Sequence, residues 1–222
     1  MKIQPLVAEF LGTFFLCFAG IAAILSAATG SGAGIVGIAL AHGLALSIAV
    51  NAFGGISGAH FNPAVSLGFL VTRRLPLLSV GPYIVAQLLG ATVAAAICRG
   101  VFPVEAVAQA QLGIPLPAAW ATPAVVLVFE FVMTYLLMTA IFGTAVDPRG
   151  QAVKIGGFGI GLTVAFDILA GGAVTGASMN PARSFGPALV LGNWHAHLFY
   201  WLAPIAGACC AALVYEHVLL KE

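Results

Sequence analysis

Long uncharged stretches limit what this chain can fold into more than any other feature of its sequence. No Asp, Glu, Lys or Arg occurs from Phe10 to Thr72, and none occurs from Leu75 to Cys98. A helix needs roughly 20 apolar residues to cross about 30 Å of hydrocarbon. Hydrophobic residues make up 61% of the chain and charged residues 7%. Because a soluble core does not need such stretches, the sequence predicts an integral membrane protein.

Breaks at glycine and proline divide the apolar sequence into six expected spans. We therefore predict an all-α membrane protein with one transmembrane domain, residues 1–222. A cleaved signal peptide at the start is the less favoured alternative, because Glu9 interrupts the apolar run and the segment has a partner later in the chain. The six spans are expected near 4–26, 34–53, 80–99, 121–142, 153–171 and 197–217.

The basic residues predict how the chain is oriented. If six spans alternate across the membrane, Arg99 falls near one side and Arg183 lies at membrane depth. The other basic residues then share the opposite side, which predicts cytoplasmic termini in a plasma (inner) membrane, because excess Lys and Arg marks the cytoplasmic face. The net charge of +1 does not point to nucleic acid, and we expect no such partner. The residues on the shared side are Lys2, Arg73, Arg74, Arg149, Lys154 and Lys221.

Two motifs occur twice, in the same order and at nearly the same spacing. "AEFLGTFFL" (8–16) matches "FEFVMTYLL" (129–137), which aligns Glu9 with Glu130. "ISGAHFNPAVS" (56–66) matches "VTGASMNPARS" (174–184). We therefore predict duplicated halves, about 1–105 and 118–222. Three spans per half is an odd number, so the second half enters from the opposite side, and inverted 3+3 repeats are typical of transport proteins with a site near the midplane.

Two apolar segments are too short to cross the bilayer. "PAVSLGFLV" (63–71) and "PARSFGPALV" (181–190) reach about 14 Å as helices, half of the hydrocarbon thickness. Asparagine is a favoured N-cap and proline suits the first helical position. We predict two re-entrant half-helices that enter from opposite sides and meet mid-membrane at their caps. The residues at these caps are Asn62, Pro63 and Ala64 in the first copy and Asn180, Pro181 and Ala182 in the second.

The loops before the half-helices, Ser57–Phe61 and Thr175–Met179, must line a cavity or be buried in protein at that depth. We expect them to present carbonyl groups to a water path. Glu9 and Glu130 fit a proton relay, since intramembrane carboxylates are often functional, but we favour a role in holding the loops through backbone N–H groups. The expected pore-lining carbonyls belong to Gly58, Ala59, His60, Gly176, Ala177 and Ser178.

Taken together, these residues resemble the aquaporin (major intrinsic protein) family over essentially the whole chain. The resemblance rests on AEFLGT, SGAHFNPAVS and TGASMNPARSFGP and on the paired glutamates. It implies a homotetramer in a lipid bilayer with a pore in each subunit, and passive passage of water rather than pumping. No enzyme is expected, because the titratable residues show no nucleophile–base or metal spacing. No cofactor or metal is expected. Ser184 and Ala188 stand where glycerol facilitators usually carry Asp and a basic residue, which favours water.

The resemblance also places a selectivity constriction at His42, Ile168, Ala177 and Arg183. Strict water channels usually carry Phe in place of this His and His in place of this Ile. The combination found here is similar to the ammonia-permeable aquaporins of plant vacuolar (tonoplast) membranes and their animal relatives. It implies passage of small neutral solutes, such as ammonia or hydrogen peroxide, besides water.

Several alternatives stay open at the level of sequence. The constriction also fits a strictly water-selective channel, and a glycerol facilitator or a secondary transporter is less favoured. His42 could instead be a packed core residue, and His60 could gate the pore or only support its loop. Asp167, next to Ile168, departs from the Asn or His of many relatives and has no assigned role.

Overall fold

Six long helices make up most of the residues that the structure describes, and all six are apolar enough to cross a membrane. The structure is a computed structural model that describes residues 2–31 and 34–220. Within these ranges every regular element is helical, so the predicted all-α fold with six spans is confirmed. Lys221 lies outside the described residues. The spans are α1 (Ile3–Ala28), α2 (Gly34–Ser57), α4 (Leu77–Val101), α6 (Pro123–Ile141), α8 (Gly156–Thr175) and α10 (Phe199–Val214).

The two predicted half-helices are also present, as α3 (Pro63–Val71) and α9 (Pro181–Leu191). Several boundaries differ from the prediction, and two of these bear on the site: Ser57 and Thr175 are the last residues of α2 and α8 rather than parts of the loops. Glycines close to these ends suggested earlier breaks, but each helix continues through them. Gly176 ends α8 in the left-handed conformation, with φ of 80°, and its N–H bonds to Gly172 O.

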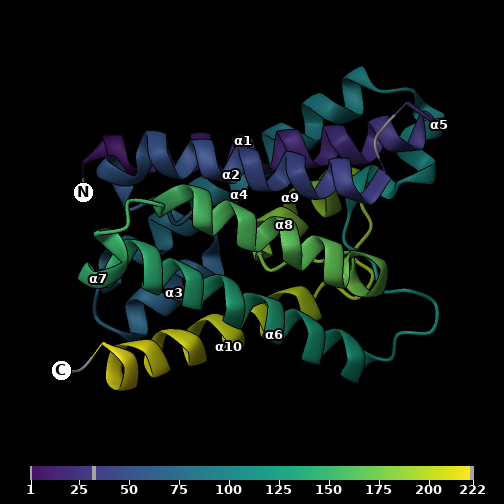
Figure 1. The fold of residues 1–222 in the computed structure, drawn as a ribbon. Helices are drawn as coiled ribbons and strands as arrows, with labels where there is room; N and C mark the ends of the chain where they lie inside the picture. The colour runs from purple at the N-terminus through teal and green to yellow at the C-terminus, as the bar shows by residue number, and fades with distance from the viewer. Residues whose placement is uncertain (1, 32–33, 221–222) are drawn as a thin grey trace.

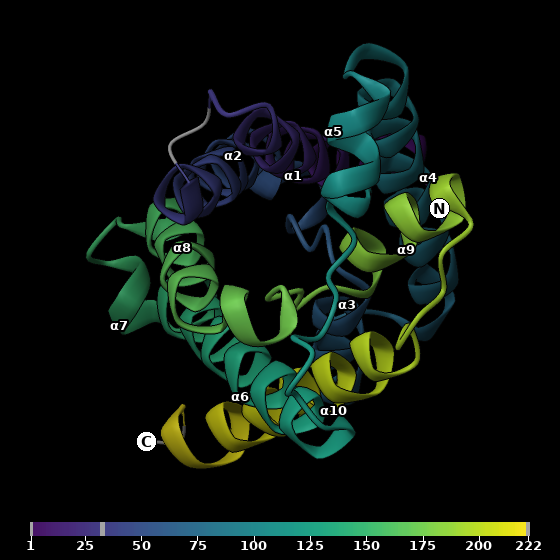
Figure 2. The ribbon, with the colours of Figure 1, turned by 90° about the vertical axis from the view of Figure 1, so that its right-hand side faces the viewer.

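The halves of the chain interlock rather than lie side by side. Among the spans, α1 packs on α2 and α4, α2 on α8, and α6 on α10. Each half-helix packs mainly on the last span of the other half: α3 on α10, and α9 on α4. Viewed from one end, the long helices surround the two half-helices (Figure 2).

A glycine permits one of these close approaches. A Cβ at Gly186 on α9 would lie 2.5 Å from the backbone carbonyl atoms of Ala91 on α4. Since no larger side chain fits there without moving a backbone, Gly186 sets how closely α9 sits against α4.

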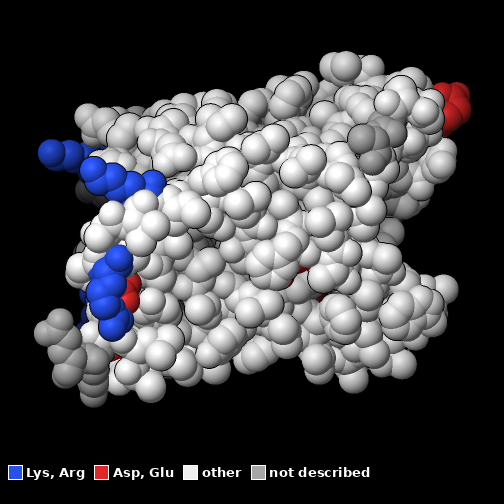
Figure 3. All heavy atoms as spheres, in the orientation of Figure 1, with Lys and Arg blue, Asp and Glu red and all other residues white. Residues whose placement is uncertain are grey.

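The termini lie at the same end of the bundle, together with α7 (Pro148–Gln151), and α5 (Val104–Gln109) lies at the opposite end (Figure 1). On the face drawn in Figure 3, the Lys and Arg side chains gather at the end that holds the termini. On this face the basic residues thus lie at one end of the bundle, as expected from the orientation that the sequence predicts.

At that same end, α6 and α10 continue as π-helical turns, Phe142–Val146 and Tyr215–Leu219. A hydrogen-bonded clamp of Asp147, Arg149 and Tyr215 joins the two turns. Asp147 accepts from the backbone N–H of Arg149 (2.8 Å), from its guanidinium (2.6 Å) and from the Tyr215 hydroxyl (3.1 Å). Arg149 also donates to Leu219 O (2.6 Å). Arg74 and Glu216 form a second link between the chain after α3 and the turn after α10, at 2.6 Å.

Candidate functional site

Asn62 and Asn180 cap the two half-helices at the centre of the bundle. Both residues have extended backbones and are followed by a proline in the first turn. Asn62 Oδ1 accepts from Ala64 N at 2.9 Å, and Asn180 Oδ1 accepts from Ala182 N at 2.9 Å. The helix N-termini, where unpaired N–H groups concentrate positive potential, therefore point at each other across the middle of the molecule.

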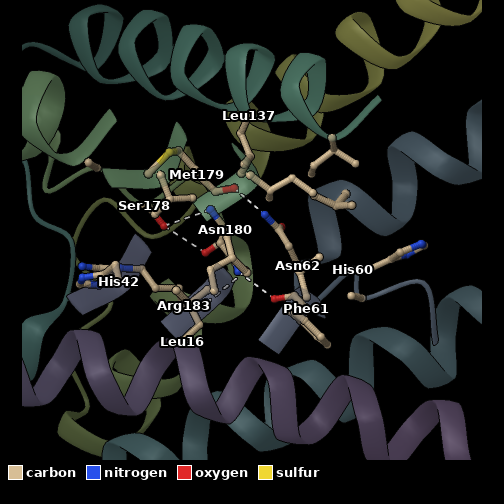
Figure 4. Close-up of a pocket in the computed structure, with 18 of the residues that line it drawn as sticks. Leu16, His42, His60, Phe61, Asn62, Leu137, Ser178, Met179, Asn180 and Arg183 are labelled. Carbon is tan, nitrogen blue, oxygen red and sulfur yellow. Dashed lines mark hydrogen bonds between the residues drawn. The ribbon is translucent and has the colours of Figure 1, made fainter. Parts of the chain in front are cut away.

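The asparagine side chains also join the halves directly. Asn62 Nδ2 donates to Met179 O at 2.8 Å, and Asn180 Nδ2 donates to Phe61 O at 2.9 Å (Figure 4). Because a side-chain amide carries two N–H bonds, each asparagine commits one to the opposite loop and keeps one for other partners.

The loops that precede the caps have an unusual backbone. Ala59 and Phe61 have φ of 54° and 51°, and Ala177 and Met179 have φ of 45° and 54°. Residues other than glycine enter this left-handed region at a cost of roughly 1–2 kcal/mol each. The matching positions in the two halves share the conformation, so the repeat seen in the sequence extends to the backbone. Such a backbone persists only where its surroundings determine it strongly.

Glu9 and Glu130 provide much of that support. Glu9 accepts from His60 N (3.0 Å) and Phe61 N (2.6 Å). Glu130 accepts from Ser178 N (2.9 Å) and Met179 N (2.8 Å). Both carboxylates are fully buried. With their oxygens occupied by loop donors, this geometry favours loop support over a proton relay.

Sequence reasoning missed several residues that hydrogen-bond to these glutamates or to the helix ends beside them. Ser57 donates to Glu9 and Thr175 donates to Glu130, each at 2.6 Å. Tyr83 and Tyr200 donate to the carbonyls of Ser57 and Thr175, at 2.9 and 2.6 Å. A signal was present, because Ser57 and Thr175 occupy the same position of the repeated motif and a tyrosine follows each at a similar spacing. Gln87, which donates to Glu9 at 2.8 Å, has no such signal.

A narrow cavity runs past the asparagine caps and leaves about 30 Å³ for the centres of water molecules. A water needs about 10–15 Å³ by this measure, so the cavity accepts a file of very few molecules. A wider space of about 360 Å³, which we call the outer vestibule, shares His42, Ile168 and Arg183 with the cavity. A second wider space of about 280 Å³, which we call the inner vestibule, shares a different set of residues with the cavity: Val50, Ala59, Val65, Ile141 and Ile160. The three spaces therefore follow one another along the bundle.

The four residues predicted to form a constriction all line the narrow cavity, and three of them also line the outer vestibule. Arg183, in the first turn of α9, is 5% exposed and donates from Nη1 to Gly113 O at 3.0 Å. Its buried Nε has no partner among the described residues. His42 and Arg183 lie together at one end of the cavity (Figure 4). These polar groups thus meet where the narrow cavity joins the outer vestibule, a place called the outer junction, which Ile168 also lines.

The predicted carbonyl residues divide among the three spaces. Gly176 lines the outer vestibule and Gly58 the inner one, whereas Ala59, His60, Ala177 and Ser178 line the narrow cavity. The residues predicted to supply acceptors are therefore distributed along the whole path.

The two residues left open by the sequence lie in different surroundings. His60 lines the cavity at the end opposite His42, with Nδ1 3.1 Å from Ser66 Oγ and its ring stacked on Phe69 at 4.5 Å. The ring is thus held on two sides. Asp167 is buried on α8 and lines neither the cavity nor the vestibules, and its Oδ2 has no partner in the described chain.

Comparisons with known proteins agree with this architecture. The model of the family described as "Major intrinsic protein" matches residues 1–215. Nodulin-26 of Glycine max is 44% identical over 217 residues, which cover 97% of this chain and 78% of the relative. Aquaporin TIP4-4 of Zea mays is 39% identical over 228 residues, covering 99% and 88%. The aquaglyceroporin structure from Plasmodium falciparum superposes with a TM-score of 0.83 at 24% identity, covering 99% and 97%, which shows a shared fold.

Proposed function

The chain belongs to the major intrinsic protein (aquaporin) family, and from that premise we propose that it is a passive water channel that excludes protons and ions. The observation that carries the proposal is the meeting of two capped helix N-termini on a cavity that has room for only a few water-sized molecules. Such a cavity lets molecules pass by exchanging hydrogen bonds along a mostly apolar wall.

Proton exclusion is proposed to follow from positive potential at two levels. At the centre, each half-helix contributes roughly half an elementary charge at its N-terminus. The free N–H of Asn62 and of Asn180 then donates to a central water, orienting its oxygen toward the asparagines and interrupting a hydrogen-bonded chain. At the outer junction Arg183, which keeps its charge in proteins, adds a second barrier to cations.

Ammonia and hydrogen peroxide are the further solutes that we propose. The buried Nε of Arg183, which has no partner among the described residues, supplies a donor at the outer junction, and the His42 ring, Ile168 and Ala177 line the cavity beside it. A small neutral molecule that replaces water there keeps polar contacts on one side. A strictly water-selective channel and a glycerol facilitator remain the alternatives that experiment must separate.

Transport in reconstituted vesicles tests the proposal. Stopped-flow light scattering with osmotic, glycerol and ammonium gradients, together with a peroxide assay, measures the four permeabilities on one preparation. We expect water, ammonia and peroxide to pass, glycerol to pass poorly, and no proton current. Fast glycerol flux would favour the facilitator, and saturable uptake that depends on an ion gradient would favour a secondary transporter.

The assembly and location are also proposals. We expect a homotetramer with one pore per subunit, in a plasma (inner) membrane, with both termini in the cytoplasm. Support comes from the large apolar side chains exposed on the outer surfaces of the spans, such as Ile48 on α2 and Phe166 on α8, which must contact lipid or another subunit. Native mass spectrometry in detergent measures the subunit number, and a monomer would contradict this part.

A further inference from the structure

A notch in α1 lies directly beside the His42 imidazole. Gly20 is buried, and a Cβ built on it would lie 2.1 Å from His42 Nε2 and 2.4 and 2.5 Å from the two ring carbons next to that atom. The Nε2 corner of the ring is therefore inserted into the space that the glycine leaves. No side chain larger than hydrogen fits at position 20 while the ring keeps this place.

The other ring nitrogen fixes the orientation of the imidazole. His42 Nδ1 lies 2.8 Å from Ile38 O. A carbonyl only accepts hydrogen bonds, so Nδ1 carries the proton of this bond. The ring is thus held at two points: by the Ile38 carbonyl on its own helix and by the notch on α1.

The repeat provides an internal comparison for this arrangement. The motif alignment places Ile141 at the position of Gly20 in the second half, and it places Ile160 at the position of His42. Both isoleucines line the narrow cavity and the inner vestibule. In the second half, where Ile141 takes the place of Gly20, the residue that corresponds to His42 is the aliphatic Ile160. In the first half, the glycine leaves room for the polar ring of His42.

We propose that Gly20 is a positioning residue for selectivity: its notch seats the His42 imidazole back against α1 and thereby sets the width of the outer junction. The inference rests on the proposed channel function. A methyl group at position 20 displaces the ring, and the open space next to it is the lumen, because His42 lines both the narrow cavity and the outer vestibule. The displaced ring then approaches Ile168 and Arg183 and narrows the path.

The experiment compares Gly20→Ala with wild type for water and hydrogen peroxide flux in vesicles. We expect the ratio of peroxide to water permeability to fall about 10-fold, the usual size of a one-methylene effect in a tight site. The variant should fold, because all three nearest atoms belong to the movable end of a side chain.

A matched control is Gly171→Ala. Its Cβ would lie 2.3 Å from Met133 Sδ, which is also the movable end of a side chain, and Gly171 lines none of the three spaces. Its ratio should equal that of wild type.

A double variant separates positioning from general packing. If Gly20 acts through the ring, Gly20→Ala should change the peroxide-to-water ratio in wild type but have no further effect in a His42→Ala background. Equal losses of both permeabilities, or the same loss with and without His42, would overturn the inference.

The imidazole nitrogen signals in solid-state NMR give a second readout, since displacement of the ring changes the bond from Nδ1 to Ile38 O. Unchanged signals would also contradict it. A wild-type protein that passes no water would remove the proposed function itself, whereas water flux with an unchanged ratio removes only the role of Gly20.

Discussion

At the residue scale, the functional centre is built from side chains that satisfy backbone groups where regular structure is broken. Each half-helix needs an entry loop in a strained conformation, and in each loop two N–H groups bond to one buried carboxylate. A buried donor left without a partner costs about 1–3 kcal/mol. The glutamates therefore matter less for their charge than for the number and direction of the bonds they accept.

This view predicts the effect of Glu130→Ala. Removing the carboxylate leaves Ser178 N and Met179 N buried without an acceptor, so the free energy of unfolding should fall on the order of 3 kcal/mol. Water flux should fall with it, because the loop carries Ala177 and Ser178 into the cavity. Thermal unfolding in detergent and stopped-flow scattering measure the two effects.

The control for that variant is Glu105→Ala. Glu105 is exposed on α5 and should change neither stability nor flux. A Glu130→Ala protein as stable as this control would show that the loop keeps its shape without the carboxylate.

At the scale of elements, close helix contacts position the half-helices, and the clamp of Asp147, Arg149 and Tyr215 holds one wall of the inner vestibule. Ala145 and Val146, in the π-helical turn after α6, line that vestibule. The turn is held by Asp147, which also caps α7 through Arg149 N. The wall of the inner vestibule thus depends on a few polar contacts. The packing of α9 on α4 depends instead on the absence of a side chain at Gly186.

The clamp predicts a local dependence on pH. The hydrogen bonds and charge of Arg149 lower the pKa of Asp147 to about 2, whereas the unfolded value is about 3.9. A depressed folded-state pKa means that the contribution to stability is present above about pH 4 and is lost as the pH falls toward 2. Amide hydrogen exchange in residues 142–151, corrected for the intrinsic pH effect, should therefore accelerate over that window.

The comparison for this prediction is Asp147→Asn, which cannot titrate. Its exchange in the same segment should be faster at neutral pH and should lack the transition between pH 4 and 2. A variant that retains the full wild-type transition would place the titrating group elsewhere.

Packing of α9 on α4 gives a prediction for Gly186→Ala. The added methyl group meets the Ala91 backbone at 2.5 Å, so the helices must separate. Overpacking of this kind costs about 1–3 kcal/mol, and the melting temperature in detergent should fall accordingly. Gly81→Ala on α4, where a Cβ meets nothing within 4 Å, is the matched control and should not lower it. Equal melting temperatures for the two variants would show that α9 can shift without cost.

At the scale of the whole molecule, local signals in the sequence predict elements well and contacts between halves poorly. The caps at Asn62 and Asn180 could be predicted because Asn-Pro before a short apolar segment is a local pattern. The bonds from these asparagines to Met179 and Phe61 could not, because they depend on how the halves are placed in space. The notch at Gly20 escaped for the same reason, since a glycine in an apolar helix has no signal of its own.

Orientation in the membrane gives a prediction for the complete chain. Single cysteines introduced at Lys2, Glu105 and Lys154, in a background without the four native cysteines, should react with a membrane-impermeant maleimide from different sides of intact cells. Positions 2 and 154 should label only after the membrane is opened, and position 105 from outside, if the basic end faces the cytoplasm as we propose. Labelling of position 154 from outside would reverse the orientation.

The interlocked packing of α3 on α10 has a consequence for the order in which the protein is made. When α3 leaves the ribosome, the span it rests on has not been synthesised, and neither has Met179, which accepts the bond from Asn62. For most of its synthesis the nascent chain therefore contains the nine apolar residues of α3 without α10, the helix on which they finally pack. Completion of the centre waits for the last helix, so a chain cut short before α10 lacks the wall against which the first half-helix rests.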